Sequence, residues 1–282
     1  MPKVTLVTDS TSYIPQKMVD QYNIHVTPQV LIWGNETLRD GVDIMPDQFY
    51  IRLAKATVMP STSQASPADF ERIFKGLLDQ GQAVLAVLLS TKLSGTMASA
   101  NQAWTCFDGA PLEVVDSNTT GMALGFLVLA AARAAEKGAT LAECKAIVVA
   151  GIPRTGVILT VDTLEFLHRG GRIGGAQRLL GTALNIKPIL ELVDGRIEPA
   201  EKVRTRRKAL ARLVELLGER TGWKKPLRVC VIHANARADA TEVLAEIQRK
   251  FTVVEGLVSD VSPAIGTHVG PGTVAITYLM EE

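Results

Sequence analysis

Aromatic side chains and cysteines are scarce in this sequence, and each shortage excludes a class of protein. Only 5% of the 282 residues are Phe, Trp or Tyr, and the formal net charge is +1. A protein dedicated to DNA or RNA needs stacking rings and a basic surface, so we expect no nucleic-acid partner. The three cysteines, Cys106, Cys144 and Cys230, are widely spaced and contain no Cys-x-x-Cys pair. Neither a disulfide framework nor a zinc site is therefore indicated.

Several signatures of enzymes and of membrane proteins are also absent. The sequence has no phosphate-binding loop, no Gly-x-Gly-x-x-Gly turn and no Gly-x-Ser-x-Gly elbow, which weakens nucleotide-binding and hydrolase interpretations. Its four histidines lack metal-ligand spacing. The longest apolar run, Met122–Ala132, is shorter than the roughly 20 residues of a membrane-spanning helix, and the N-terminus resembles no signal segment. We expect a cytoplasmic protein without a stable membrane anchor, metal or cofactor.

Strand and helix patterns alternate in the first half of the chain. Short, continuous apolar runs at Val4–Thr8, Ala83–Leu89 and Leu112–Val115 are typical of strands covered on both faces, as in a parallel sheet. Between them, Ser66 and Pro67 provide an N-cap and a first helical residue. This alternation predicts a doubly wound α/β domain over residues 1–155.

The second half has a different pattern. The Asp194-Gly195 pair between the extended segments Ile189–Val193 and Arg196–Val203 predicts a β-hairpin. Further segments predict a strand at 157–161, an interrupted helical stretch at 163–184, helices at 206–217 and 239–251, and strands at 227–232 and 273–279. We therefore predict an α+β domain with a partly antiparallel sheet over residues 156–282.

Polar clusters follow the predicted strands of the first half. Thr8–Ser12, Ser90–Thr96 and Asp116–Thr120 each come directly after an apolar run, and Ser61–Ser66 precedes a predicted helix. Taken singly, each cluster is a cap or a turn. In an open α/β sheet, however, ligands bind at the carboxyl ends of the strands, where helix N-termini favour anions. The four clusters together predict a small anion-binding site at this edge.

Three other segments have both a structural and a functional interpretation. Arg169–Gly175 is either an interhelical turn or a pair of guanidinium groups presented to an oxyanion, and Thr267–Gly272 is either a loop or the carrier of a functional histidine. Lys202–Arg212 contains six basic residues and no acidic one. It is either a solvated helix face or a docking surface for an anionic partner.

Read in order, nine short motifs resemble those of the DegV family, and they extend over essentially the whole chain. They are Val7–Ser10 (VTDS), Thr62–Gln64 (TSQ), Leu93–Thr96 (LSGT), Val115–Ser117 (VDS), Thr163–Leu167 (TLEFL), Arg169–Ile173 (RGGRI), Asn185–Ile189 (NIKPI), Lys202–Arg204 (KVR) and His268–Gly272 (HVGPG). LSGT and GGRI together are specific. One departure is Ala65, where the family usually has proline, and it removes no ligand group.

The resemblance implies a lipid-binding protein without catalytic residues of its own. One long-chain fatty acid, such as palmitate, would lie in an apolar tunnel between or alongside the two domains. Hydroxyls of the two short motifs, here Thr62 and Ser94, would hold its carboxylate. Arg172, Arg204 and His268 would belong to the polar network or face a separate kinase subunit, which would phosphorylate the bound acid for lipid metabolism. Two alternatives stay open: a phosphotransferase of the dihydroxyacetone-kinase-like class, and a protein-interaction module that uses residues 202–212.

Overall fold

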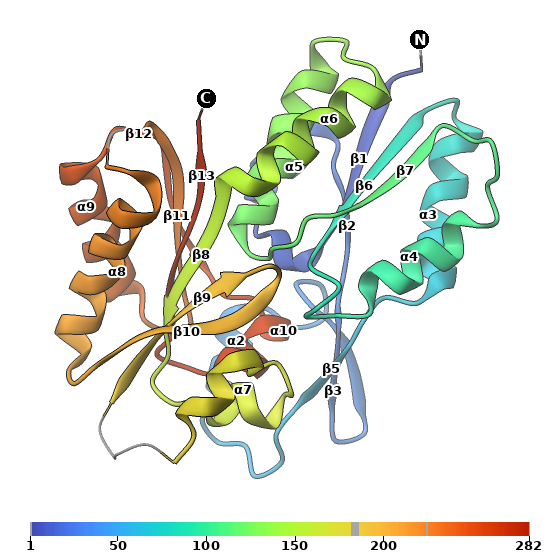
Figure 1. Ribbon diagram of the computed structural model, residues 1–282. Helices are drawn as coiled ribbons and strands as arrows, with labels where there is room; N and C mark the ends of the chain where they lie inside the picture. Colours follow the sequence, from blue (N-terminus) through green and yellow to red (C-terminus); the bar gives the residue numbers. More distant parts are fainter. Residues whose placement is uncertain (1, 182–185, 224, 282) are drawn as a thin grey trace.

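A four-stranded parallel sheet forms the first half of the computed structural model, which describes residues 2–181, 186–223 and 225–281 (Figure 1). Its strand order is β2-β1-β6-β7, with β1 (Val4–Asp9), β2 (His25–Thr27), β6 (Ala83–Leu88) and β7 (Leu112–Asp116). The three predicted strands are thus confirmed. Every residue of β1 and β6 is buried, because helices cover both faces of the sheet.

The two faces are packed by different helices. Alternate residues of β6 point to opposite faces, so Val84, Ala86 and Leu88 contact α3 (Pro67–Asp79) and α4 (Thr96–Trp104). Leu85 and Val87 lie in the core formed with α5 (Met122–Glu136) and α6 (Leu141–Gly151). Helix α3 begins as predicted, since the Ser66 hydroxyl accepts a hydrogen bond from the Asp69 amide. Helix α1 (Gln16–Tyr22) connects β1 to β2.

A six-stranded mixed sheet forms the second half, in the order β10-β9-β8-β13-β11-β12. The strands are β8 (Thr155–Thr160), β9 (Lys187–Val193), β10 (Arg196–Val203), β11 (Leu227–His233), β12 (Val253–Asp260) and β13 (Val274–Met280). Helices α8 (Arg206–Thr221) and α9 (Arg237–Lys250) cover one face, and α5 packs on the other. The predicted hairpin is confirmed, with Asp194 and Gly195 both at positive φ in its turn. Strand β12 had no prediction.

A small third sheet and two short helices complete the fold below the carboxyl ends of β1 and β6 (Figure 1). The sheet has the order β4-β3-β5, with β3 (Val30–Trp33), β4 (Glu36–Arg39) and β5 (Ser61–Ser63), and it lies near α2 (Pro46–Leu53) and α10 (Pro263–Val269). The polar triplet 61–63 is therefore a strand. It pairs with β3, where Thr62 lies opposite Leu31.

Two segments of the second half differ from their simplest interpretation. In the described part of the predicted stretch 163–184, residues 163–181, the helices are the short α7 (Glu165–Arg169) and a 3₁₀ helix at Gly174–Leu179, separated by the predicted glycine interruption. The segment 267–272, interpreted as a loop before the last strand, begins within α10, which Ser262 caps and Pro263 opens. Residues 182–185, including Asn185 of one motif, lie outside the described residues.

The predicted division of the chain falls at the first residue of β8. Apolar side chains from both sides of that point pack into one core, in which Leu6 and Phe126 join Leu159, Ile232 and Leu279. Among the described residues, no helix has both the length and the apolar character needed to cross a bilayer. The mixed α/β class predicted from the sequence is confirmed.

Candidate functional site

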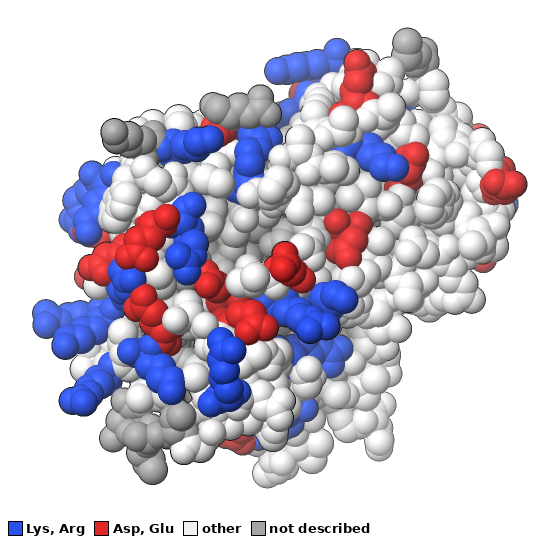
Figure 2. Space-filling view, in the orientation of Figure 1, with Lys and Arg blue, Asp and Glu red and all other residues white. Residues whose placement is uncertain are grey.

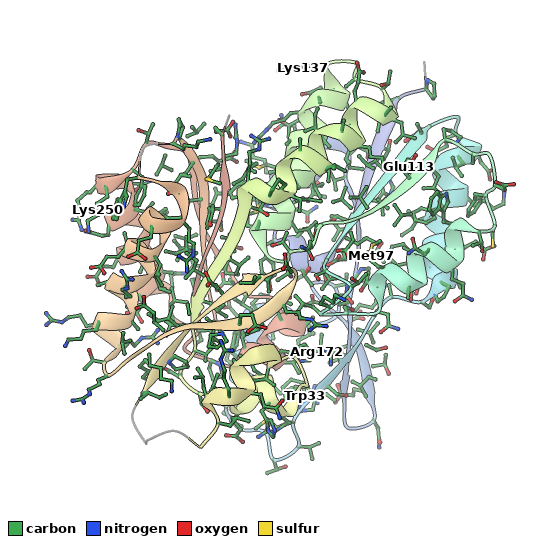
Figure 3. The ribbon with its side chains drawn as sticks, viewed as in Figure 1. Trp33, Met97, Glu113, Lys137, Arg172 and Lys250 are labelled. Carbon is green, nitrogen blue, oxygen red and sulfur yellow. The ribbon has the colours of Figure 1, made fainter. Side chains whose placement is uncertain are left out.

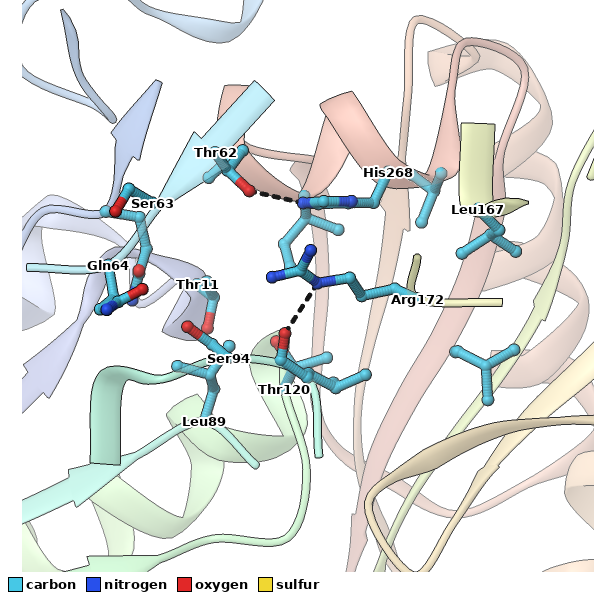
Figure 4. A pocket seen from close by; sticks show the side chains of 16 residues that line it. Thr11, Thr62, Ser63, Gln64, Leu89, Ser94, Thr120, Leu167, Arg172 and His268 are labelled. Carbon is cyan, nitrogen blue, oxygen red and sulfur yellow. Dashed lines mark hydrogen bonds between the residues drawn. The ribbon is translucent and has the colours of Figure 1, made fainter. Parts of the chain in front are cut away.

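One pocket lies where the loops after β1 and β6 face β5, α7 and α10 (Figure 4). The open space between its walls is about 620 Å³, a figure that includes the mouth of the pocket. All four polar clusters contribute to its lining: Thr11, Thr62–Gln64, Ser94 and Thr120. The predicted convergence of the four clusters is confirmed, but Thr62–Gln64 reaches the pocket from β5 of the small third sheet and not from the edge of the parallel sheet.

A buried carboxylate fixes the loops at this edge. Strand β1 is the switch point of the sheet, because the chain pairs β2 on one side of it and β6 on the other. Asp9, its last residue, accepts hydrogen bonds from the backbone amides of Thr11, at 3.0 Å, and of Leu89, at 2.9 Å. Burial raises the pKa of Asp9, and these donors partly offset that effect. Asp9 therefore holds the two loops side by side.

Thr62 and His268 form a polar pair across the pocket. The Thr62 hydroxyl lies 2.7 Å from Nε2 of His268, so strand β5 and helix α10 are joined at this point (Figure 4). Burial, with a smaller contribution from the charge of Arg172, lowers the pKa of His268 to about 4. The ring is therefore neutral at pH 7. Its Nδ1 atom has no hydrogen-bond partner in the described part of the chain.

Arg172 supplies positive charge to the same wall. Its Nε donates to the carbonyl of Leu93, at 3.0 Å, and its Nη1 to the carbonyl of Gly170, at 2.7 Å. No Asp or Glu among the described residues pairs with it, so its charge is not neutralised by a carboxylate. Gly170 allows the close packing here, because a Cβ at that position would lie 2.1 Å from Nδ1 of His268. Figure 3 shows Arg172 near the middle of the molecule, whereas Lys137 and Lys250 lie at its edges.

Ser94 lies directly before helix α4. Its hydroxyl is 2.9 Å from the Thr96 hydroxyl and accepts a hydrogen bond from the Thr96 amide. Gly95 permits close contact with the side chain of Gln64, since a Cβ there would lie 3.1 Å from the Gln64 amide. The LSGT and TSQ motifs are therefore packed against each other. Thr120, on the loop between β7 and α5, adds a buried hydroxyl that has no hydrogen-bond partner within the described segments.

The pocket also has an apolar wall. Seven aliphatic side chains from both halves of the molecule form it: Leu89, Leu93, Leu167, Ile197, Ala264, Ile265 and Val269. Hydroxyl groups, a neutral imidazole and a guanidinium thus adjoin aliphatic side chains in one cavity. This arrangement fits an amphipathic ligand with an anionic head. Among the described residues, no group of three or more His, Cys, Asp or Glu side chains could hold a metal ion.

Four of the five predicted site residues lie together. Thr62, Ser94, Arg172 and His268 all line the pocket, whereas Arg204 is exposed and does not. Sequence reasoning named the clusters that contain Thr11, Gln64 and Thr120, but not these residues as individuals. It gave no signal for Gln29, which also lines the pocket and comes from the connection between β2 and β3.

Comparison with known proteins is consistent across sequence and structure. A family model described as an uncharacterised protein of the DegV family matches residues 3–281. A DegV domain-containing protein of Caldanaerobacter subterraneus is 36% identical over 279 residues, 99% of each chain. The structure of a fatty-acid-binding DegV family protein from Thermus thermophilus has a TM-score of 0.94 at 34% identity and covers 99% of this chain and 100% of that one. DegV of Bacillus subtilis, a fatty-acid-binding protein, has a TM-score of 0.91 at 34% identity, with 100% of both chains covered.

Proposed function

This chain belongs to the DegV family, and we propose that it binds one long-chain fatty acid, such as palmitate, in the pocket described above. Thr62 and Ser94 hold the carboxylate, and Arg172 and His268 complete its polar surroundings. The observation that carries the proposal is the amphipathic lining, in which these four residues adjoin an aliphatic wall. The fatty-acid binding of the Thermus thermophilus and Bacillus subtilis proteins supports it.

Head and tail contribute differently to binding. Burial of each methylene contributes about 0.8 kcal/mol, so about ten buried methylenes provide about 8 kcal/mol, which corresponds to micromolar affinity. A carboxylate must exchange its water for donors, and hydroxyl and guanidinium groups supply them. The tail therefore provides most of the affinity, while the polar end fixes the orientation of the ligand.

We further propose that a separate kinase subunit phosphorylates the bound acid in the cytoplasm, for use in lipid metabolism. The basic segment 202–212 supports a docking role. Arg206 and Arg212 form ion pairs with acidic side chains, but Lys202, Arg204, Arg207 and Lys208 have none among the described residues. On the face shown in Figure 2, basic and acidic side chains gather over the half that contains α8 and α9. Unpaired cations there would complement an acidic kinase surface.

Solvent extraction of the purified protein, followed by mass spectrometry, tests the binding proposal. We expect about one long-chain fatty acid per chain, because a ligand with its tail buried leaves slowly. The same preparation should not hydrolyse ATP, since the sequence lacks a nucleotide-binding loop. A chain that arrives without lipid and turns over ATP in proportion to its concentration would contradict the proposal and favour the phosphotransferase alternative.

A further inference from the structure

Two buried polar side chains continue the hydrogen bonds of Ser94: Thr96, and Gln29, which also lines the pocket. Thr96 is fully buried and Gln29 is 4% exposed. Nε2 of Gln29 donates to the Thr96 hydroxyl at 3.0 Å, and that hydroxyl lies 2.9 Å from the Ser94 hydroxyl. The three side chains form a continuous line that ends in the pocket. No residue of this line other than Ser94 has a role in the proposed function so far.

Both polar atoms of the Gln29 amide lie close to the Thr96 hydroxyl oxygen. Nε2 is 3.0 Å from it and Oε1 is 3.2 Å from it. An NH₂ group can only donate, so along the shorter contact the Thr96 hydroxyl accepts a hydrogen bond from Gln29. Its own proton is then available for another partner.

The direction of the remaining hydrogen bonds follows from proton counting. Thr96 has one hydroxyl proton and two acceptors in reach, Oγ of Ser94 at 2.9 Å and Oε1 of Gln29 at 3.2 Å. The shorter contact is to Ser94. Donation along it leaves the hydroxyl proton of Ser94 free to point into the pocket. The opposite direction would use that proton on Thr96 and present only lone pairs to a ligand.

We propose that Gln29 and Thr96 are positioning residues that keep Ser94 a hydrogen-bond donor and so make the pocket select a carboxylate over a neutral head group. This inference rests on the proposed function. Each hydroxyl in the line polarises the next, which strengthens the terminal O–H as a donor to an anion. A fatty alcohol can donate as well as accept, and it therefore binds to Ser94 in either direction.

The test compares two ligands of equal chain length on delipidated protein. Palmitate and hexadecanol are each titrated against bound cis-parinaric acid, a fluorescent fatty acid, on the wild-type chain and on Thr96→Val. Valine has the shape of threonine without its hydroxyl. We expect the palmitate affinity to fall roughly tenfold and the hexadecanol affinity to change less than about threefold. Thr96→Ser, which keeps the hydroxyl, should restore the wild-type ratio of the two affinities.

Gln29→Met provides a second, independent variant in case the buried valine destabilises the start of α4. It removes the donor to Thr96 at nearly the same volume, and it should shift the ratio in the same direction as Thr96→Val. If the affinities of a folded variant for palmitate and hexadecanol fall equally, or do not fall, Gln29 and Thr96 are not positioning residues for Ser94. That result would leave the proposed binding of a fatty acid by the wild-type chain intact. Failure of the wild-type chain to bind palmitate would instead overturn the proposed function.

Discussion

The double substitution Thr62→Ala and Ser94→Ala is expected to lower the affinity for palmitate by at least about a hundredfold. Each hydrogen bond to a charged group contributes roughly 1.5–3 kcal/mol, and this variant removes two of them. Both side chains are small and only partly buried, so truncation opens little cavity and the fold should persist. The measurement is displacement of cis-parinaric acid from delipidated protein, with thermal unfolding as the check on folding.

A matched control for this variant lies on the same strand. Ser61 is exposed, belongs to β5 and does not line the pocket. Ser61→Ala should therefore bind palmitate like the wild-type chain. If the double variant is folded and purifies with its full load of fatty acid, Thr62 and Ser94 do not hold the carboxylate.

Arg172 and Arg204 are expected to differ in what their loss affects. Arg172→Gln should weaken palmitate binding by roughly ten- to a hundredfold, because it removes the guanidinium that lines the pocket. Arg204→Gln should leave palmitate binding unchanged, since Arg204 is exposed and outside the pocket. With a cognate kinase subunit, however, it should slow acyl-phosphate formation by roughly fivefold at low salt.

The salt dependence of acyl-phosphate formation tests whether Arg204→Gln acts by weakening the docking of the kinase subunit. Charges on an exposed surface are screened over about 8–10 Å at physiological ionic strength, so the difference between Arg204→Gln and the wild-type chain should shrink as salt is added. Lys137→Gln, at an edge remote from Arg172 in Figure 3, is a suitable control of equal charge change. An Arg204→Gln chain that supports phosphorylation at the wild-type rate at both low and high salt would remove this residue from the kinase-facing surface.

Local sequence patterns predicted the strands and helices whose burial follows one regular pattern from end to end. Strands β1 and β6 are buried on both faces, and their continuous apolar runs reported this directly. Strand β12 is an edge strand that is only partly buried and contains Glu255 and Gly256, so neither an apolar run nor strict alternation identified it. Strand β5 is Ser-Thr-Ser and exists because β3, some thirty residues earlier, pairs with it.

For the site, too, the sequence predicted the residues that follow a local pattern and missed those that only the fold brings together. The strand-end position of three polar clusters was enough to bring Thr11, Ser94 and Thr120 together, because parallel strands place their carboxyl ends at one edge. Thr62 reaches the same pocket from β5, through a pairing with β3 that no local pattern indicated. Helix α10 was missed although Ser262-Pro263 is the same start signal as Ser66-Pro67. Gln29 had no local signal, since its side-chain partner Thr96 is distant in sequence and only the fold brings the two into contact.

A crystal structure of the delipidated protein reloaded with palmitate tests the central claim most directly. The claim is that the carboxylate, and not the tail, occupies the end of the pocket formed by β5 and the loop before α4. We predict carboxylate oxygens within about 3.2 Å of the hydroxyls of both Thr62 and Ser94, with the acyl chain along Leu167, Ile197 and Val269. Density that places the carboxylate in solvent, or the methyl end beside Thr62 and Ser94, would contradict the account.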